Sequence, residues 1–194
     1  MNRTPTRIET EQLSLTPVSP RDEPMLLAIF RDAEVRRYLL DGTLVDADWV
    51  HAEVEASRAR FSDGSLGIWL ATARDGGAAV GFTGFRPAGK PPVLELLYGL
   101  LPAFWGRGFA IEMARAMVAR AFAAGHNVVR AAVDAPNIAS IRVLENLGMT
   151  VERRSQRAFG EMRHYQLARP RPTPRSAMSS RFMKTTRRPP VIPR

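Results

Sequence analysis

A segment with the composition of a phosphate-binding loop lies in the middle of the chain, at positions 102–110 (PAFWGRGFA). Gly106 and Gly108 allow the backbone to turn tightly and bring its N–H groups close to a ligand. The helix predicted to begin at Phe109 adds unpaired amides and the positive end of its dipole, a combination that suits a pyrophosphate. A dinucleotide fingerprint requires a third glycine where this chain has Ile111, and the Gly-Lys-Ser/Thr signature of a nucleoside-triphosphate loop does not occur. A Gly-x-Gly pair before a helix also occurs in ordinary turns, so spacing alone leaves both interpretations open.

Other residue types narrow the chemistry that is available. The chain has no cysteine, which excludes disulfides, a thiolate nucleophile and cysteine-based zinc sites. No ligand spacing links its three histidines, so we predict no metal site. Asn137 and Ser140 stand at the start of a predicted helix, where an asparagine N-cap and a serine three positions later are typical. Capping and ligand binding are compatible interpretations of these two side chains.

The elements that must position these residues follow from hydrophobic periodicity and turn signals. Asp75-Gly76-Gly77 indicates a hairpin within a meander of three strands. We predict four helices: one from Pro24, one after Asp46 or Asp48, one over 109–124 and one that begins after Pro136 and ends at Leu147. We predict strands over 13–17, 68–72, 80–86, 93–100, 128–133, 149–154 and 159–167. This order predicts a single α+β domain with a central twisted, mixed β-sheet flanked by helices. The leucine pattern of 93–100 predicts a central strand that is buried on both faces.

Positive charge is concentrated at the C-terminal end of the chain. Of 28 lysine and arginine residues, seven arginines and Lys184 lie in 168–194, which has no acidic residue; the other positions hold 20 basic and 19 acidic side chains. A nearly neutral body argues against a nucleic-acid-binding domain. We predict one folded domain over 1–168 and a disordered Pro/Arg-rich tail over 169–194, because the tail has too few apolar residues to offset the entropy of ordering. Either the tail makes a weak electrostatic contact with RNA, the ribosome or anionic lipid, or it has no role.

Other features of the sequence indicate where in the cell the protein is located. No apolar run approaches the roughly 20 residues that a membrane-spanning helix requires. Positions 1–11 are polar and mixed in charge, and they lack the apolar stretch of a secretory signal. With the absence of cysteine, these features predict a cytoplasmic protein.

Two segments at the right distance from one another resemble motifs of the GNAT superfamily of N-acetyltransferases. They are 104–114 (FWGRGFAIEMA) and 137–149 (NIASIRVLENLGM). The opening segment TEQLSLTP at 10–17 and FRDAEVRRYL at 30–39 are similar to the RimJ/RimL-type branch, which contains ribosomal-protein N-terminal acetyltransferases. The resemblance covers about residues 8–169.

The resemblance implies how an acyl-CoA cleft is built. In this family the sheet splays open beside the phosphate loop, and the pantetheine arm of acetyl-CoA lies in the gap like an added strand. By this resemblance, the residues that contact acetyl-CoA are Tyr98, Gly99, Leu100, Trp105, Gly106, Arg107, Gly108, Phe109, Ala110 and Asn137. The first three would face the pantetheine, the loop would hold the pyrophosphate, and Asn137 would approach the arm from the other side together with Ser140.

Four positions depart from the family pattern. Trp105 stands where the broad superfamily has glutamine or arginine, although tryptophan is common in the RimJ/RimL branch. Leu144 stands where many GNAT enzymes carry the tyrosine that protonates the departing thiolate, so that general acid is missing from its usual position. Gln12 replaces the usual arginine of the opening motif, and Pro170 interrupts the usual ending.

The chemistry that the resemblance implies is direct attack of a primary amine on the acetyl thioester. A protein α-amine with a pKa near 8 is about 10% neutral at pH 7, so it requires only a modest base. We predict Glu95, on the strand beside the cleft, as the catalytic base; a solvated or salt-bridged strand residue is the alternative. We predict Ser140 as the residue that donates a hydrogen bond or a proton to the sulfur. No metal is required.

Several functions and acceptors stay open at this stage. The fold and loop would also serve a non-enzymatic acyl-CoA sensor or interaction module, an alternative that the missing tyrosine keeps open. A tail-driven RNA or ribosome adaptor is a third hypothesis. For an acetyltransferase, the acceptor amine could belong to a protein N-terminus, an amino acid, a polyamine or an antibiotic. Trp49, Trp69 and Phe85 are predicted to lie in the core or in a groove wall.

Overall fold

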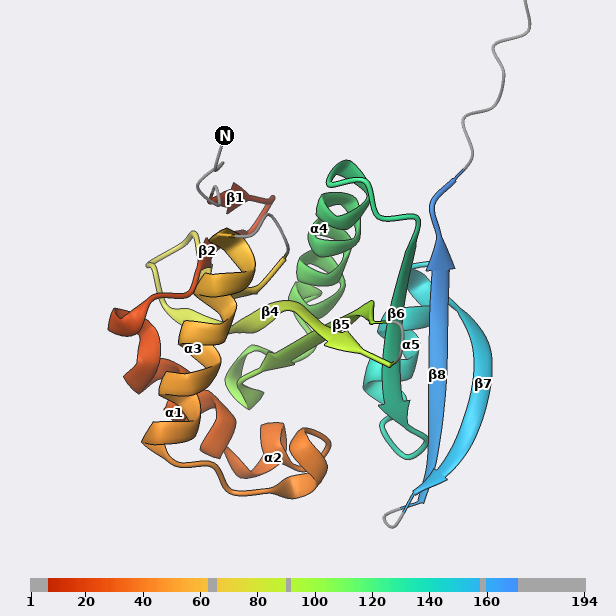
Figure 1. The fold of residues 1–194 in the computed structure, drawn as a ribbon. Helices are drawn as coiled ribbons and strands as arrows, with labels where there is room; N and C mark the ends of the chain where they lie inside the picture. Colours follow the sequence, from red (N-terminus) through yellow and green to blue (C-terminus); the bar gives the residue numbers. More distant parts are fainter. Residues whose placement is uncertain (1–6, 63–65, 90–91, 158–159, 171–194) are drawn as a thin grey trace, which may run out of the picture.

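Eight strands form one sheet that separates two groups of helices in the computed structural model, which describes residues 7–62, 66–89, 92–157 and 160–170 (Figure 1). The strands are neighbours in the order β1-β2-β3-β4-β5-β6-β8-β7. Their bounds are β1 Ile8–Glu9, β2 Leu13–Pro17, β3 Ile68–Ala73, β4 Ala79–Ala88, β5 Val93–Leu100, β6 Val128–Asp134, β7 Thr150–Arg157 and β8 Gly160–Ala168. β5 and β6 pair in parallel, and every other pair of neighbouring strands is antiparallel. The sheet is therefore mixed, as predicted.

The helices fall into an N-terminal group and a group that connects the later strands. The α-helices are α1 Glu23–Arg31, α2 Ala33–Arg36, α3 Ala47–Ser62, α4 Phe109–Ala123 and α5 Ile138–Asn146, and the short 3-10 helices are η1 Pro20–Asp22, η2 Leu40–Gly42 and η3 Pro102–Phe104. The first three α-helices connect β2 to β3, α4 connects β5 to β6, and α5 connects β6 to β7. This single α+β domain confirms the predicted fold class. The predicted tail lies outside the described residues from position 171 onward.

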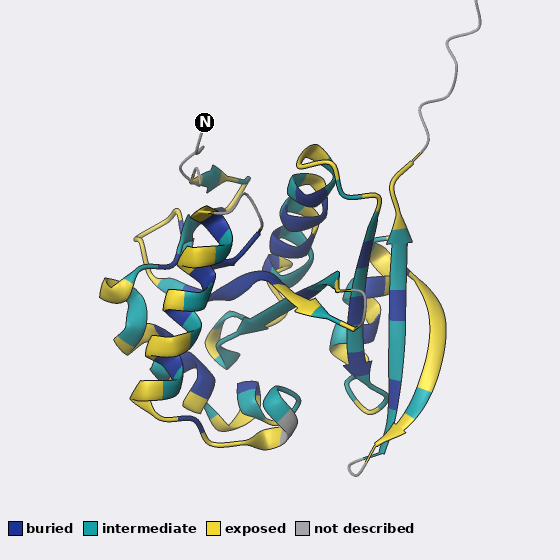
Figure 2. Cartoon of the chain, in the orientation of Figure 1, coloured by how far each residue is buried: buried dark blue, intermediate teal, exposed yellow. Residues whose placement is uncertain are grey.

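Alternation along the strands produces one apolar core on each face of the sheet. In β3, Trp69 and Ala71 belong to the core beneath α4, whereas Ile68 and Leu70 belong to the core beneath α1 and α3. Successive side chains of a strand point to opposite faces, so one strand supplies both cores. Figure 2 shows α4 buried on its side towards the sheet, while the edge strand β7 is exposed over most of its length.

The central feature of the sheet is the divergence of β5 from β6. β4 and β5 pair continuously from Gly81 and Leu100 to Ala88 and Val93, whereas in the described chain the parallel register of β5 with β6 is confined to Glu95 and Arg130. The later part of β5 therefore has a strand neighbour on one side. The predicted burial of β5 on both faces is confirmed only in part: Leu96 is buried, whereas the other leucines of the strand pack against the cores of both faces and stay partly exposed.

Most predicted elements are confirmed within a few residues of their ends. The hairpin at Asp75-Gly76-Gly77 connects β3 to β4, and Pro24 occupies the first turn of α1. The sequence analysis missed α2, which is only four residues long. Its signal is Asp32, whose carboxylate accepts from the backbone N–H groups of Glu34 and Val35 as a helix N-cap does. An isolated turn of this kind carries too little periodicity to be recognised in sequence.

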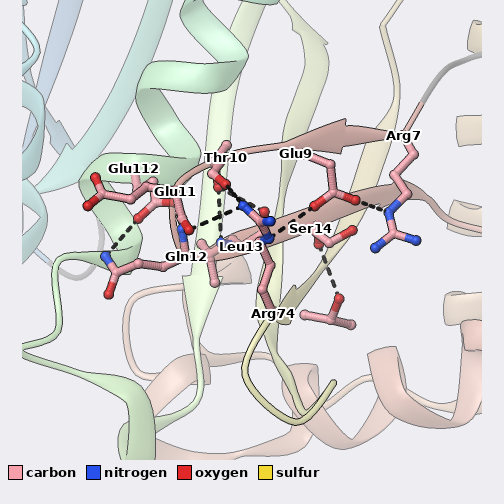
Figure 3. A network of polar contacts seen from close by, with 10 residues as sticks. Arg7, Glu9, Thr10, Glu11, Gln12, Leu13, Ser14, Arg74 and Glu112 are labelled. Carbon is pink, nitrogen blue, oxygen red and sulfur yellow. Dashed lines mark hydrogen bonds and ion pairs between the residues drawn. The ribbon is translucent and has the colours of Figure 1, made fainter.

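A polar contact ties the N-terminal strands to the first turn of α4 (Figure 3). The Glu112 carboxylate accepts from the Gln12 backbone N–H at 2.8 Å and from Gln12 Nε2 at 2.9 Å. Burial raises the pKa of Glu112, but the hydrogen bonds from Thr10, Gln12 and Leu13 outweigh it, and the pKa lies below its ordinary value of 4.5. Glu112 thus fixes the start of α4 to Gln12, the residue immediately before β2, and its negative charge also interacts favourably with the helix dipole.

We predict that Glu112→Gln lowers the free energy of unfolding by about 1 kcal/mol at neutral pH, since it replaces a charged acceptor with a neutral one. The folded-state pKa is lowered, so the stabilisation by Glu112 is fully present above the unfolded pKa and is lost as pH falls through the folded value. Urea denaturation at about pH 7 and about pH 3.5 should show a difference from wild type that narrows in acid. Glu11→Gln, at an exposed neighbouring position, is the matched control. An equal difference at both pH values would contradict the assignment.

Candidate active site

The predicted phosphate loop has the backbone geometry that its glycines allow. Gly106 has φ 74° and Gly108 has φ 80°, both in the left-handed region. A Cβ atom at either position would meet nothing within 4 Å, so the backbone conformation, and not space, favours glycine here. Gly108 is the N-cap of α4, and its carbonyl accepts the helical hydrogen bond from Glu112 N. The loop thus leads directly from the end of β5 into a long helix.

Backbone amides at the start of α4 are available to a ligand. Among the residues that the structure describes, no carbonyl or side chain accepts a hydrogen bond from the amides of Gly106 to Ile111. Unpaired N–H groups at a helix N-terminus, together with the positive end of the helix dipole, form an anion-binding site. The geometry therefore suits a phosphate or pyrophosphate.

Aromatic residues hold this loop in place. The Arg107 guanidinium lies over the Phe109 ring at 4.6 Å and near the Phe104 ring at 5.8 Å. Phe109 is only 1% exposed, so its side chain belongs to the core and only its backbone can contact a ligand. The Trp105 indole Nε1 donates to the Leu100 carbonyl at 2.8 Å, which fastens the loop to the end of β5. These supporting roles of Trp105 and Phe109 were not predicted.

A cavity of about 560 Å³, the central cavity, lies where β5 and β6 diverge. Its walls come from β5, β6, the start of α5 and residues between Tyr38 and Asp46. Four predicted site residues line it together, namely Glu95, Tyr98, Asn137 and Ser140. The loop residues from Trp105 to Ala110 and the β5 residues Gly99 and Leu100 do not line it. The candidate site therefore has two parts, joined by the end of β5.

Ser140 is held from two directions at the wall of the central cavity. Its backbone N–H donates to Asn137 Oδ1 at 3.1 Å, which confirms Asn137 as the N-cap of α5. Its Oγ lies 2.7 Å from the Tyr98 hydroxyl, with either oxygen able to donate, and the single proton of that hydroxyl can instead be donated to the Ser140 carbonyl at 3.3 Å. Burial raises the pKa of Tyr98 to about 12, against a smaller opposing effect of the Ser140 hydrogen bond. The phenol is therefore protonated at neutral pH and serves as a hydrogen-bonding group.

Glu95 forms an ion pair at the last point where β5 and β6 are in register. Its Oε1 accepts from Arg86 Nε at 2.9 Å and from Arg86 Nη2 at 2.7 Å. The Glu95 side chain is 14% exposed, compared with 50% for Arg86. Glu95 is thus a salt-bridged strand residue, which was the alternative to a catalytic role. Because Glu95 also lines the central cavity, its carboxylate lies near any ligand that binds there.

Several residues of the site gave no signal in the sequence. Arg86, Asp134, Arg157 and Met162 line the central cavity from four separate segments of the chain. Trp49, one of the predicted core or groove-wall aromatics, also lines it, whereas Trp69 and Phe85 are fully buried. Leu144, which replaces the usual family tyrosine, lines the cavity with an exposed fraction of only 1%. Proximity of this kind depends on the tertiary fold and leaves no motif.

Two further properties concern the described part of the chain. No group of three or more His, Cys, Asp or Glu side chains there could hold a metal ion. None of its helices is both long enough and apolar enough to cross a membrane.

Comparisons with known proteins agree with this geometry. The family model described as acetyltransferase (GNAT) domain matches residues 12–150. YoaA of Bacillus subtilis, an uncharacterised N-acetyltransferase, is 28% identical over 147 residues, which is 75% of this chain and 83% of that protein. The structure of RimL, the ribosomal L7/L12 α-N-protein acetyltransferase in complex with coenzyme A, is similar with a TM-score of 0.72 at 15% identity, over 84% of this chain and 98% of that one.

A second solved structure has the same fold. YncA of Salmonella typhimurium, solved with its cofactor acetyl-CoA, is similar with a TM-score of 0.68 at 20% identity, over 84% of this chain and 98% of that one. The two structural likenesses concern the fold, and the family match concerns the sequence itself. Because the matched region extends over more than half of the chain, this protein belongs to the GNAT family of acetyltransferases.

Proposed function

We propose that this protein transfers the acetyl group of acetyl-CoA to a primary amine, and that a protein N-terminal α-amine of the RimJ/RimL type is one source of that amine. The observation that carries the proposal is the placement, along one diverging strand, of two complementary sites. Unpaired amides from Gly106 to Ile111 follow the end of β5, and Glu95 and Tyr98 of the same strand line the central cavity. The similarity to RimL and the opening motif at 10–17 support the branch.

Acetyl-CoA would bind along the later part of β5. The amides of the phosphate loop would hold the pyrophosphate, and Arg107 would add positive charge beside it. The pantetheine arm would follow Tyr98, Gly99 and Leu100, on the side of β5 that β6 leaves uncovered. This course brings the thioester to the central cavity, where Asn137 and Ser140 lie across from β5.

We assign the handling of the amine proton to Glu95. Only the neutral amine attacks, and an α-amine with a pKa near 8 is about 10% neutral at pH 7. A weak proton acceptor is therefore sufficient. Arg86 binds Oε1 of Glu95, so we assign the role to Oε2, which would act through a water molecule. The amine nitrogen forms the new C–N bond, the C–S bond breaks, and the proton lost by the amine passes by way of solvent.

We assign to Ser140 the role of hydrogen-bond donor to the departing sulfur. A thiolate whose pKa is near 8.5 is a tolerable leaving group, so a hydrogen bond can replace the full proton transfer of the missing family tyrosine. When the Tyr98 hydroxyl donates to Ser140 Oγ, the Ser140 hydroxyl proton is directed towards the cavity. Hydrogen bonds in such a chain polarise one another, which strengthens the donor that faces the sulfur.

The direct test of the proposed function is release of free CoA thiol from acetyl-CoA, measured with N-terminal peptides and small amines beside a control without acceptor. We expect acceptor-dependent release in the wild type. Gly108→Ala should raise KM for acetyl-CoA several-fold, because it disfavours the left-handed φ that exposes the loop amides. Gly125→Ala introduces the same kind of strain (φ 97°) at the other end of α4 and should leave KM unchanged.

Two other results have distinct meanings. Stabilisation by CoA in a melting scan without any turnover would favour the acyl-CoA sensor over the enzyme; a ligand at ~100 times its Kd adds about 2.7 kcal/mol. If CoA neither stabilises the protein nor supports turnover, the assignment of the loop as a CoA-binding site is overturned. If Gly108→Ala and Gly125→Ala raised KM for acetyl-CoA equally, Gly108 would contribute to stability and not specifically to acetyl-CoA binding.

We predict that Glu95→Gln lowers kcat by about 10- to 100-fold near pH 7, at the lower end for a general base because part of the amine is already neutral. The deficit should shrink as pH rises past the pKa of the amine, near 8, where the base is no longer required. A pH profile of kcat tests this. Glu152→Gln is the matched control, since Glu152 forms a similar ion pair with Arg130 at 2.7 Å. A deficit independent of pH would argue for a purely structural Glu95.

We predict that Tyr98→Phe and Ser140→Ala each lower kcat by about 10-fold, the value of one neutral hydrogen bond of about 1.4 kcal/mol, with little change in KM for acetyl-CoA. Because Tyr98 acts through Ser140, the double variant should lose little more than Ser140→Ala alone. A double-mutant cycle on kcat measures this coupling, and melting temperatures check the folding of each variant. Additive losses would separate the two residues, and unchanged kcat in both would remove them from the mechanism.

A further inference from the structure

The central cavity has two unlike walls, which points to the chemical class of its acceptor. One wall, built from β4, β5, β6, α5, β7 and β8, carries most of the charged and polar side chains of the cavity, Glu95 and Ser140 among them, although apolar residues stand between them. The facing wall comes from the N-terminal half of the chain and is largely aromatic and aliphatic, with Tyr38, Leu40, Leu44 and Trp49. A ligand that satisfies both walls must be polar at its reacting end and apolar at the other.

The apolar wall is continuous with the core beneath α1 and α3. Leu40 and Trp49 are partly buried and pack against that core. The Trp49 ring meets the Phe30 ring edge to face, with centroids 5.3 Å apart and an angle of 78° between planes. Phe30 is itself a core residue with 5% exposure, so Trp49 is held from behind. Leu40 and Trp49 therefore extend the apolar core to the cavity and are packed against it from behind.

Two features of the same wall indicate that something covers it. Leu44 is 59% exposed, which makes it one of the large apolar residues left most open to water in the described chain. Leu40 has φ 54° and is the one non-glycine residue with positive φ among the described residues. A leucine rarely adopts this conformation, and such backbone strain tends to occur at binding sites, where the fold maintains it against its cost. Both features lie within a few residues of each other at the mouth of the central cavity.

On these observations, and resting on the acetyl transfer proposed above, we propose that the acceptor is a primary amine flanked by a bulky apolar or aromatic group. The amine would lie towards Glu95 and the thioester, and the apolar group would cover Leu40, Leu44 and Trp49. This chemistry is shared by two sources, a peptide whose first residue is leucine or phenylalanine and a free arylalkylamine. A strongly polar acceptor would leave the apolar wall exposed to water, and its own polar groups would lose hydration without gaining hydrogen-bond partners.

The test compares acceptors that differ only in the apolar group. Peptides of one sequence with Phe, Leu, Ala, Ser or Asp at the first position, and phenethylamine beside ethanolamine, are assayed for acetyl-CoA-dependent thiol release. We expect kcat/KM for Phe and Leu peptides to exceed that for Ser and Asp peptides by about 10- to 100-fold, the discrimination that a few buried methylene groups provide. The small-amine pair should show the same order if the source is a free amine.

A variant locates the preference on the wall. Leu44→Asp changes an exposed residue, so it should fold normally and lower kcat/KM for the Phe peptide about 10-fold while leaving KM for acetyl-CoA unchanged. Met25→Asp is the matched control, because Met25 is an apolar residue of α1 that is 39% exposed and does not line the central cavity. It should have no effect on either substrate.

Each outcome decides between the two proposals. Activity with Ser or Asp peptides equal to or above that with Phe and Leu overturns the acceptor class and leaves acetyl transfer intact. A Phe preference that Leu44→Asp does not reduce overturns the assignment to this wall. If no acceptor supports thiol release, the proposed function is overturned, and the proposed acceptor class with it. Activity with peptides alone, or with free amines alone, supports the inference and identifies the source.

Discussion

The structure depends on one constraint, which is that β5 and β6 separate after a single point of parallel register at Glu95 and Arg130. A strand inside a sheet normally has its backbone groups paired on both sides. Among the described residues, β5 beyond Glu95 pairs with β4 but not with β6. The central cavity forms in the opening between β5 and β6. The continuous pairing of β5 with β4 on its other side keeps the strand in place despite the gap.

The same divergence explains why the two parts of the candidate site stand on one strand. β5 passes the cavity with Glu95 and Tyr98 and then ends at the loop whose glycines begin α4. A long thin ligand with a phosphate at one end and a reacting group at the other can satisfy both parts at once. The Trp105 indole on the Leu100 carbonyl and the Glu112 contact with Gln12 fix the loop and helix relative to the sheet.

Several residues serve the fold and the proposed chemistry with the same atoms. Asn137 caps α5 and thereby sets the position of Ser140, whose hydroxyl meets Tyr98 across the gap. The absence of the usual family tyrosine at Leu144 is compatible with this arrangement, because a partly buried, protonated phenol comes instead from β5. The polar groups that would flank the proposed thioester position are thus brought together by a contact between distant segments of the chain.

Local patterns in the sequence were sufficient to predict most of the elements, the mixed α+β class, the tight glycine loop before α4 and the capping of α5. Each of these depends on local periodicity, on a left-handed glycine or on a side chain that bonds its own neighbours. The tertiary structure alone decided that β5 is half open, that Glu95 pairs with Arg86, that Tyr98 reaches Ser140 and that the wall around Leu40 and Leu44 faces the cavity. These are contacts between residues far apart in the chain, and they are set by where strands separate and helices pack, which no local pattern of residues encodes.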